Sequence, residues 1–275
     1  MGRSHVRRWL ACAALVLLCG CSVASPTRVE PLNYLPGIAG DYFPIRSSAT
    51  GSTNHIYIHY PESYAARPGD HYPIVYVLDG DSLFPMLAPE HLFLTYDDRT
   101  PEAIVVGIAY GSFSQPINRR EIDFGSGAAA FQRFLATELL PTVERRVRAD
   151  PAKRIVVGQS FGGSFVLYSA FTQPDLFWGR IASNPSARMH QSLLAGQPAA
   201  AQRRDLHLMV VSGTANNPPG RAAALKWVQN WQQGSTPWKL ERIDIQGGTH
   251  AADIANAYRA ALRRLFNVSA APSGH

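Results

Sequence analysis

Residues 155–170 read IVVGQSFGGSFVLYSA, and this stretch decides the fold. A short run rich in β-branched side chains, residues 154–157, predicts a buried strand, and the apolar pattern over residues 161–171 predicts a helix. Ser160 lies in the turn between them, next to glycines that can sit where a Cβ would clash. The stretch therefore predicts a strand, a sharp turn and a helix, with the serine hydroxyl at the carboxyl end of the strand.

The turn itself, Gly158-Gln159-Ser160-Phe161-Gly162, fits the pattern G-x-S-x-G. In that pattern a strained turn between strand and helix exposes the serine Oγ as a nucleophile. The pattern is short enough to arise by chance, so the strand before it and the helix after it carry the interpretation. The alternative is a glycine-rich connection with a surface serine.

The rest of the chain alternates predicted strands with predicted helices. Further apolar or alternating runs predict strands at residues 55–60, 73–78, 103–109, 206–211 and 240–245. Helical patterns cover residues 126–148, where Pro141 predicts a kink, and residues 254–265. A chain of 275 residues with this alternation predicts one α/β domain, a mostly parallel sheet flanked by helices that binds ligands at the carboxyl ends of its strands.

The N-terminal residues predict export. Residues 1–20 combine a basic start with an apolar run too short to span a bilayer, as a signal peptide does, and Leu18-Cys19-Gly20-Cys21 resembles a bacterial lipobox. That resemblance implies lipidation at Cys21 and, because a serine follows it, an anchor in the outer membrane facing the periplasm or the cell surface. The alternative is cleavage after Ala24, which gives a soluble periplasmic or secreted protein.

Residues 21–52, rich in Pro, Gly, Ser and Thr, are expected to form a tether. Residues 53–268 are then expected to form the α/β domain, and residues 269–275 a tail. Cys12 and Cys19 leave with the signal peptide, so the domain has no disulfide and no cysteine-based metal site.

The charge of the chain does not predict a nucleic-acid partner. Removal of the signal peptide leaves 23 basic residues against 20 acidic ones, a net charge of +3. The densest basic cluster, residues 145–148, falls at a predicted helix end, where cations offset the helix dipole. We read it as a solvated helix face, and we expect contact with a membrane only through the lipid anchor.

Seven segments carry a family resemblance that spans residues 54–266. In chain order they are YPIVYVLDGDSLF, AIVVGIAY, RREIDF, FLATELLPTVE, RIVVGQSFGGSF, PDLFWGRIASNPS and GGTHAADI. They resemble the putative-esterase family of α/β-hydrolases, which includes ferric enterobactin esterase, other siderophore esterases, esterase D-like proteins and the mycolyltransferases. The resemblance implies the α/β-hydrolase fold and a carboxylic ester hydrolase that acts on a small-molecule ester without a metal or cofactor.

The resemblance also implies a set of site residues. Ser160 is the expected nucleophile, and His250, in the loop between the last strand and the last helix, the expected base. The oxyanion would be held by the backbone N–H of Phe161 and that of Asp81, with Gly80 as the alternative to Asp81. Arg120 and Asp123 match the R-x-x-D segment of the family and are candidates for substrate binding or for a structural ion pair.

The chain departs from the family at two places. It reads DFGSG where siderophore esterases carry an aromatic residue followed by Thr-Pro, which argues against a trilactone substrate and favours short acyl esters. The acid of a triad should follow the strand at residues 206–211, yet residues 206–240 contain no Asp or Glu. We expect a Ser160–His250 dyad helped at most by Asn216, whose side-chain oxygen would orient the histidine; the alternative acids are Glu241, Asp244 and Asp253.

The expected function is therefore a serine ester hydrolase that forms an acyl-enzyme on Ser160. The alternatives within the family are a siderophore trilactone esterase and an acyltransferase. The alternative of another class is a lipid-anchored binding protein on a disabled hydrolase scaffold.

The lipobox makes a testable prediction about localisation. Wild-type protein should partition with membranes in a bacterial host that lipidates its exported proteins, because an acylated cysteine anchors the chain. Cys21→Ser should release the protein or block its processing, while Cys19→Ser should leave partitioning unchanged. Wild-type protein found only in the soluble periplasmic fraction would favour simple signal cleavage.

Overall fold

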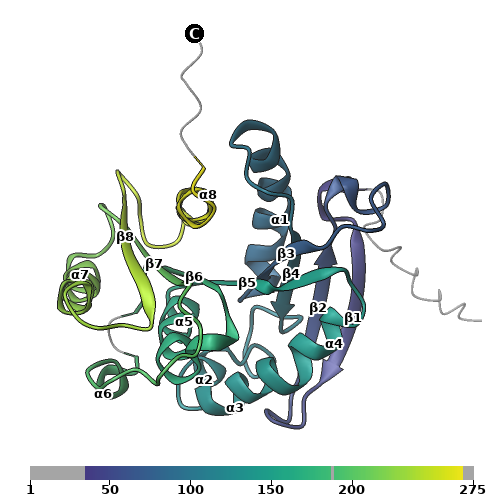
Figure 1. Cartoon of the computed structure of the whole chain (residues 1–275). Helices are drawn as coiled ribbons and strands as arrows, with labels where there is room; N and C mark the ends of the chain where they lie inside the picture. Colours follow the sequence, from purple (N-terminus) through teal and green to yellow (C-terminus); the bar gives the residue numbers. More distant parts are fainter. Residues whose placement is uncertain (1–34, 187–188, 269–275) are drawn as a thin grey trace, which may run out of the picture. The chain divides into compact units, whose positions relative to one another are not determined.

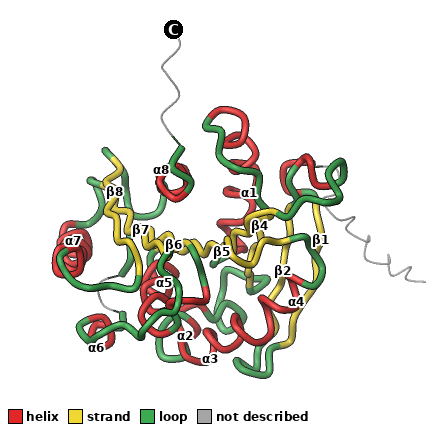
Figure 2. Tube along the Cα trace, viewed as in Figure 1, coloured by secondary structure: helices red, strands yellow, loops and turns green. Residues whose placement is uncertain are grey.

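The computed structural model describes residues 35–186 and 189–268. Its strands are β1 (Gly40–Arg46), β2 (Thr53–His59), β3 (Tyr72–Val77), β4 (Ile104–Ala109), β5 (Ala149–Gln159), β6 (Gly179–Ser183), β7 (Leu206–Gly213) and β8 (Trp238–Ile245). Its helices are α1 (Gly80–Asp97), α2 (Arg120–Asp123), α3 (Ala128–Arg133), α4 (Leu140–Glu144), α5 (Phe161–Thr172), α6 (Gln191–Leu194), α7 (Pro218–Gln232) and α8 (Ile254–Leu265). Figure 1 and Figure 2 show these elements along the chain.

The strands form one sheet in the order β1-β2-β4-β3-β5-β6-β7-β8. β1 pairs antiparallel with β2, and β2 antiparallel with β4; every later pair, from β3–β4 to β7–β8, is parallel. All of β4 is apolar and buried, and β3 is buried except at Pro73, as strands covered on both faces must be. The mostly parallel sheet that the sequence predicts is therefore present, and the carboxyl ends of β3, β5, β6, β7 and β8 share one edge.

Helices cover both faces of the sheet (Figure 1). α1 and α8 pack on one face, where Leu87 and Tyr258 are fully buried, and α3, α4, α5 and α7 pack on the other around Phe131 and Phe165. The two buried clusters are separated by the sheet itself, because neighbouring side chains of a strand point to opposite faces. This arrangement leaves the carboxyl edge of the parallel strands free to hold a site.

The first strand corrects one sequence prediction. Residues 40–46 lie in the segment expected to be a tether, yet they form β1 and pair along their full length with β2. β1 is an edge strand with a mostly exposed burial pattern and carries Pro44, so it lacks the apolar run by which the other strands were predicted. The sheet therefore begins about a dozen residues earlier than predicted.

The helical pattern over residues 126–148 is interrupted where Pro141 predicts a kink. α3 is followed by a π-helical stretch, residues 134–139, and α4 begins immediately after it. Proline has no N–H to donate and its ring clashes with the preceding turn, and a wider helical turn accommodates both effects. The apolar stripe nevertheless stays on the sheet, since Phe134, Leu139 and Val143 are buried.

The export prediction lies outside the described residues, which do not include Cys21. Within residues 35–186 and 189–268, no helix has both the length and the apolar character needed to cross a membrane.

One buried histidine, His91, makes the stability of the fold depend on pH. His91 in α1 is 3% exposed; its Nδ1 lies 2.8 Å from the Tyr258 hydroxyl and its Nε2 3.1 Å from the carbonyl oxygen of Pro101. Because that carbonyl can only accept, Nε2 carries the proton, and Nδ1 accepts from Tyr258. Burial lowers the pKa of His91 to about 4 from an ordinary value of 6.5, so the ring is neutral in the folded protein at neutral pH.

This shift predicts a loss of stability in acid. As pH falls from about 6.5 towards 4, the unfolded chain binds a proton at His91 before the folded protein does, so the free energy of unfolding should fall by roughly 3 kcal/mol. Urea unfolding of His91→Gln at several pH values should show a shallower dependence than the wild type, and the exposed His71→Gln should match the wild type. Equal pH dependence in all three proteins would contradict the assignment.

Candidate active site

Ser160 lies in a strained turn between β5 and α5. Its backbone has φ 58° and ψ −115°, in a region that residues with a side chain rarely adopt. The turn is tight enough that a Cβ at Gly158 would collide with the backbone carbonyl of Gly162. The strand, turn and helix predicted around G-x-S-x-G are all present, and the geometry presents Oγ at the carboxyl edge of the sheet.

His250 lies in the loop between β8 and α8 and reaches Ser160. Its Nε2 is 2.9 Å from Ser160 Oγ, and its Nδ1 is 3.0 Å from Oδ1 of Asn216. Asn216 follows β7, whose end is the position of the third residue in an α/β-hydrolase site. Three residues from three strand ends thus form a line of hydrogen bonds from the hydroxyl to the amide.

A second asparagine, Asn184 at the end of β6, fixes which way these amides point. Its Oδ1 accepts from the backbone N–H of Gly213 and from Nδ2 of Asn216, each at 3.0 Å. Its Nδ2 donates to the carbonyl oxygens of Thr249 and His250 at 3.1 and 3.0 Å. Because a backbone N–H can only donate and a carbonyl can only accept, the amide cannot be turned over without losing these bonds.

The same reasoning sets the tautomer of His250. Asn216 must donate through Nδ2 to Asn184, so its Oδ1 faces both the backbone N–H of Asn217, at 2.8 Å, and His250. An oxygen that only accepts requires a proton on Nδ1 of the histidine. Nε2 then has a free lone pair, as it must to take the proton of Ser160.

Two of the three acids weighed from the sequence, Asp244 and Glu241, have other partners. Asp244 pairs with Arg221 at 2.9 Å and with Arg242 at 3.1 Å, and Glu241 pairs with Lys239 at 2.9 Å. Asp253 precedes α8, and its buried Oδ2 has no hydrogen-bond partner among the described residues; it lies close to where a Cβ on Gly248 would stand. The geometry therefore favours Asn216 as the partner of His250 Nδ1 and gives none of these acids that position.

Two helix N-termini point to where an oxyanion would form. Phe161 begins α5 and Gly80 begins α1, and the first N–H groups of a helix have no acceptor within it. The two ends touch, since a Cβ on Gly162 would lie 3.2 Å from Oδ2 of Asp79. The carboxylate of Asp81 accepts from the backbone N–H groups of Tyr110 and Gly111 at 2.7 and 2.8 Å.

Arg120 and Asp123 do not form a pair with each other. Arg120 donates from Nε and Nη2 to both oxygens of Asp79, at 2.8 and 3.0 Å, and lines the pocket beside Ser160. Burial raises the pKa of Asp79, and the two bonds from Arg120 oppose that rise. Asp123 is buried and faces Arg119 at 3.5 Å, away from the pocket lining, so the structure gives it a structural position.

The site is open on two sides of Ser160. On one side is a polar cavity of about 280 Å³ lined by Asp79, Asp81, Asn118, Arg120 and Phe113, among others. On the other is a larger cavity of about 570 Å³ lined by Phe161, Pro185, Ser186, Asn216 and Ala223, among others. Ser160 and His250 line both, so a bond placed at Oγ has room for a group on either side.

The sequence reasoning found Ser160, His250 and Asn216 but gave no role to Asn184 or to Asp79. Asn184 is 3% exposed and has φ 42°, and it follows a strand, β6, that was not predicted. An asparagine directly before a proline after an apolar run is the signal that was available. Asp79 also has a left-handed backbone, with φ 53°, and its partner lies 41 positions away in sequence.

Comparison with known proteins assigns the chain to a family. Residues 47–259 match the model of the family described as putative esterase. The ferri-bacillibactin esterase BesA of Bacillus subtilis is 29% identical over 168 residues, which are 52% of this chain and 56% of that enzyme. The apo-salmochelin esterase of Escherichia coli O6:H1 is 27% identical over 248 residues, which are 80% of this chain and 76% of that enzyme.

A solved structure agrees in fold. The BES protein from Bacillus cereus superposes with a TM-score of 0.72 at 22% identity, covering 82% of this chain and 94% of that one. At this identity the likeness shows the fold alone, and it confirms the predicted α/β-hydrolase architecture. The family match confirms the resemblance that the seven sequence segments carry.

The line of hydrogen bonds predicts how activity depends on Asn216. Asn216→Ala should lower kcat for 4-nitrophenyl acetate by about 100-fold with little change in KM, because His250 loses the acceptor that fixes its tautomer. Asp253→Ala, Asp244→Ala and Glu241→Ala should each stay within about tenfold of wild type, while His250→Ala should not. A loss in any of these three acid variants as large as in His250→Ala would identify a displaced acid.

Proposed function

The chain belongs to the putative esterase family and is a carboxylic ester hydrolase, and from this premise we propose that it cleaves ester-linked siderophores through an acyl-enzyme on Ser160. The observation that carries the mechanism is the hydrogen-bond line from Ser160 through His250 to Asn216. Two relatives, an esterase of ferri-bacillibactin and one of apo-salmochelin, support this substrate class over the short acyl esters that the DFGSG departure at residues 123–127 favours.

The first half of the reaction uses the geometry as it stands. Nε2 of His250 takes the proton of Ser160 Oγ as Oγ attacks the ester carbonyl. Asn216 holds Nδ1–H, so the imidazolium that forms keeps its orientation. The carbonyl oxygen becomes negative beside the N–H of Phe161 and the start of α1, where two helix dipoles add to the hydrogen bonds.

The second half reverses the proton transfer. His250 gives its proton to the leaving alkoxide, and the acyl group remains on Oγ. Water then attacks the acyl carbon while His250 takes its proton; the bond to Oγ breaks, the carboxylic acid leaves, and His250 returns the proton to Ser160 Oγ. An alcohol in place of that water would make the same site an acyltransferase; the siderophore-esterase relatives favour hydrolysis.

The salt bridge between Arg120 and Asp79 supports the oxyanion position. Asp79 ends the turn from which α1 begins, and two bonds from Arg120 hold its carboxylate. The Arg120 guanidinium also lies over the Phe161 ring, 5.2 Å from its centroid. One cation thus contacts both segments that supply the N–H donors, and we propose that it positions them in addition to lining the polar cavity.

We also propose that the enzyme is exported and held by a lipid on Cys21, in the outer membrane. The lipobox at residues 18–21 supports this location, and a soluble periplasmic enzyme is the alternative.

Loss of the nucleophile tests the proposed function. Ser160→Ala should lower hydrolysis of bacillibactin and salmochelin by at least about four orders of magnitude, because the covalent step is lost while alanine fits the turn. Product release would be followed by liquid chromatography, and a fluorophosphonate probe should label the wild type and not Ser160→Ala. The exposed Ser192→Ala is the matched control.

Three results would count against the proposal. Turnover by Ser160→Ala within about tenfold of wild type would remove Ser160 as the nucleophile. Wild-type protein that binds these siderophores without cleaving any ester would favour the disabled binding scaffold. Cleavage of short esters with no cleavage of either siderophore would leave the esterase mechanism and reject the substrate class.

A further inference from the structure

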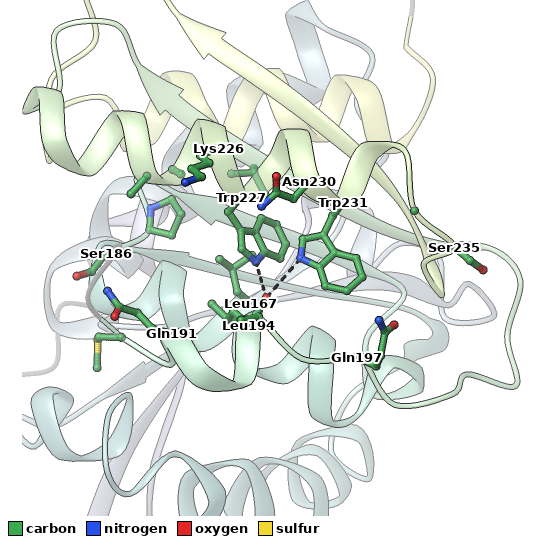
Figure 3. Close-up of a pocket in the computed structure, with 17 residues that line it drawn as sticks. Leu167, Ser186, Gln191, Leu194, Gln197, Lys226, Trp227, Asn230, Trp231 and Ser235 are labelled. Atoms are coloured by element: carbon green, nitrogen blue, oxygen red, sulfur yellow. Dashed lines mark hydrogen bonds between the residues drawn. The ribbon is translucent and has the colours of Figure 1, made fainter.

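A large cavity with a tryptophan pair lies beyond the site (Figure 3). Its volume is about 900 Å³, and residues of α7, α6 and the middle of α5 line it. Trp227 and Trp231 project into it side by side from α7, and Leu167 and Leu194 contribute apolar surface from the opposite wall. A volume in this range is typical of cavities that bind small organic molecules.

The cavity continues into the space beside Ser160. Pro185, Ser186, Gln191 and Ala223 line both the 900 Å³ cavity and the 570 Å³ cavity that holds Ser160 and His250. Along α7 the lining runs from Gly220 through Ala223 to the two tryptophans, at the three- and four-residue spacing of one helix face. At 1.5 Å per residue, Trp227 and Trp231 lie about 10 and about 16 Å along the helix from Gly220.

The indoles are fixed in place, and their polar groups are already used. Nε1 of Trp227 and Nε1 of Trp231 both donate to the carbonyl oxygen of Leu194, at 3.2 and 3.4 Å. Phe171 packs edge-on against Trp231, at 5.4 Å between ring centroids and 87° between planes. A ligand therefore meets ring surface and no free indole N–H, and flat apolar groups, aromatic rings above all, match that surface.

The charge of the residues that line this cavity limits the class of ligand further. Among the described residues that line the cavity, Lys226 alone is charged. Although the Lys226 side chain is exposed, a cationic group would meet a like charge there, whereas a neutral or anionic ring would not. The cavity beside Arg120, by contrast, is small and polar and cannot hold a long apolar arm.

We propose that this cavity, defined by Trp227 and Trp231, is a subsite for one extended arm of the ester, and that the arm ends in a neutral or anionic aromatic ring. This inference rests on the proposed function, because that function places the ester bond to be cleaved at Ser160. The passage past Ala223 joins the two positions, so the ester reaches Oγ while the ring lies about 10 to 16 Å along α7 from Gly220.

A matched series of synthetic esters tests the subsite. The 4-nitrophenyl esters of acetic, phenylacetic, dodecanoic and 8-phenyloctanoic acid vary the acyl arm, and the acetates of dodecanol and 8-phenyloctanol vary the alcohol arm. In one of the two series, the ester with the distant phenyl group should exceed its alkyl counterpart in kcat/KM by about fivefold to tenfold, as one aromatic contact allows. Phenylacetate, whose ring is too close to the ester, should show no such gain.

Variants then locate the effect. Trp227→Leu and Trp231→Leu should each reduce the gain of the phenyl-tipped ester while leaving acetate turnover within about twofold. Ala223→Phe should close the passage, and it removes no packed aromatic ring, so it serves if a tryptophan variant fails to fold. Ala222→Phe is its control, because Ala222 is exposed on the same helix.

The outcomes separate the subsite from the reaction. Equal kcat/KM for phenyl-tipped and alkyl esters in both series would overturn the aromatic subsite, as would a gain that survives Trp227→Leu, Trp231→Leu and Ala223→Phe. Absence of Ser160-dependent turnover for every ester, acetate included, would reject the proposed function instead. Acetate turnover with a flat length preference would reject only the subsite.

Discussion

The side-chain amide of Asn184 joins the loops that follow three different strands, and the position of His250 depends on it. Its oxygen holds Gly213 and Asn216 after β7, and its nitrogen holds the backbone of the histidine loop after β8. Every bond it makes has a backbone group or a second fixed amide at the other end. A buried amide with all its bonds made is rigid, and that rigidity is passed on to the tautomer of the catalytic base.

An amide in place of the usual carboxylate changes what the third residue contributes. A carboxylate both orients the histidine and stabilises the imidazolium by charge, whereas Asn216 supplies only an acceptor. The amide avoids the cost of burying an anion, because residue 216 is only 7% exposed. Its neighbour Asn184 presents an oxygen to it, which accepts a hydrogen bond from the amide nitrogen of Asn216. An aspartate at position 216 would place a carboxylate oxygen against the side-chain oxygen of Asn184, with no proton between them. The hydrogen bond between the two side chains therefore requires the amide of Asn216.

The sequence predicted the parts of the site that depend on local pattern. The run before Ser160, its glycines and the loop position of His250 all follow from neighbours in the chain, and the structure brings those residues together. The residues whose roles were not predicted act through partners far away in the sequence. Asp79 accepts from Arg120, and Asn184 bonds to the backbone of Gly213 and His250. The helical patterns found in the sequence do not include α7, which opens with Pro218-Pro219-Gly220, although proline suits the first turn of a helix. Tertiary contact, and not propensity, decides these positions.

α7 also explains why the two sides of Ser160 differ. Its first turn closes against the site, where Asn217 accepts from the N–H of Gly220, and its later turns carry the tryptophan pair outward. On the opposite side of Ser160, the start of α1 and the salt bridge between Asp79 and Arg120 line a smaller cavity that contains charged groups. An ester at Ser160 therefore meets a polar wall that stabilises the reacting carbonyl and an apolar groove that can bind the rest of the molecule. Binding far from the reacting bond can then orient that bond, which is how remote contacts increase kcat as well as affinity.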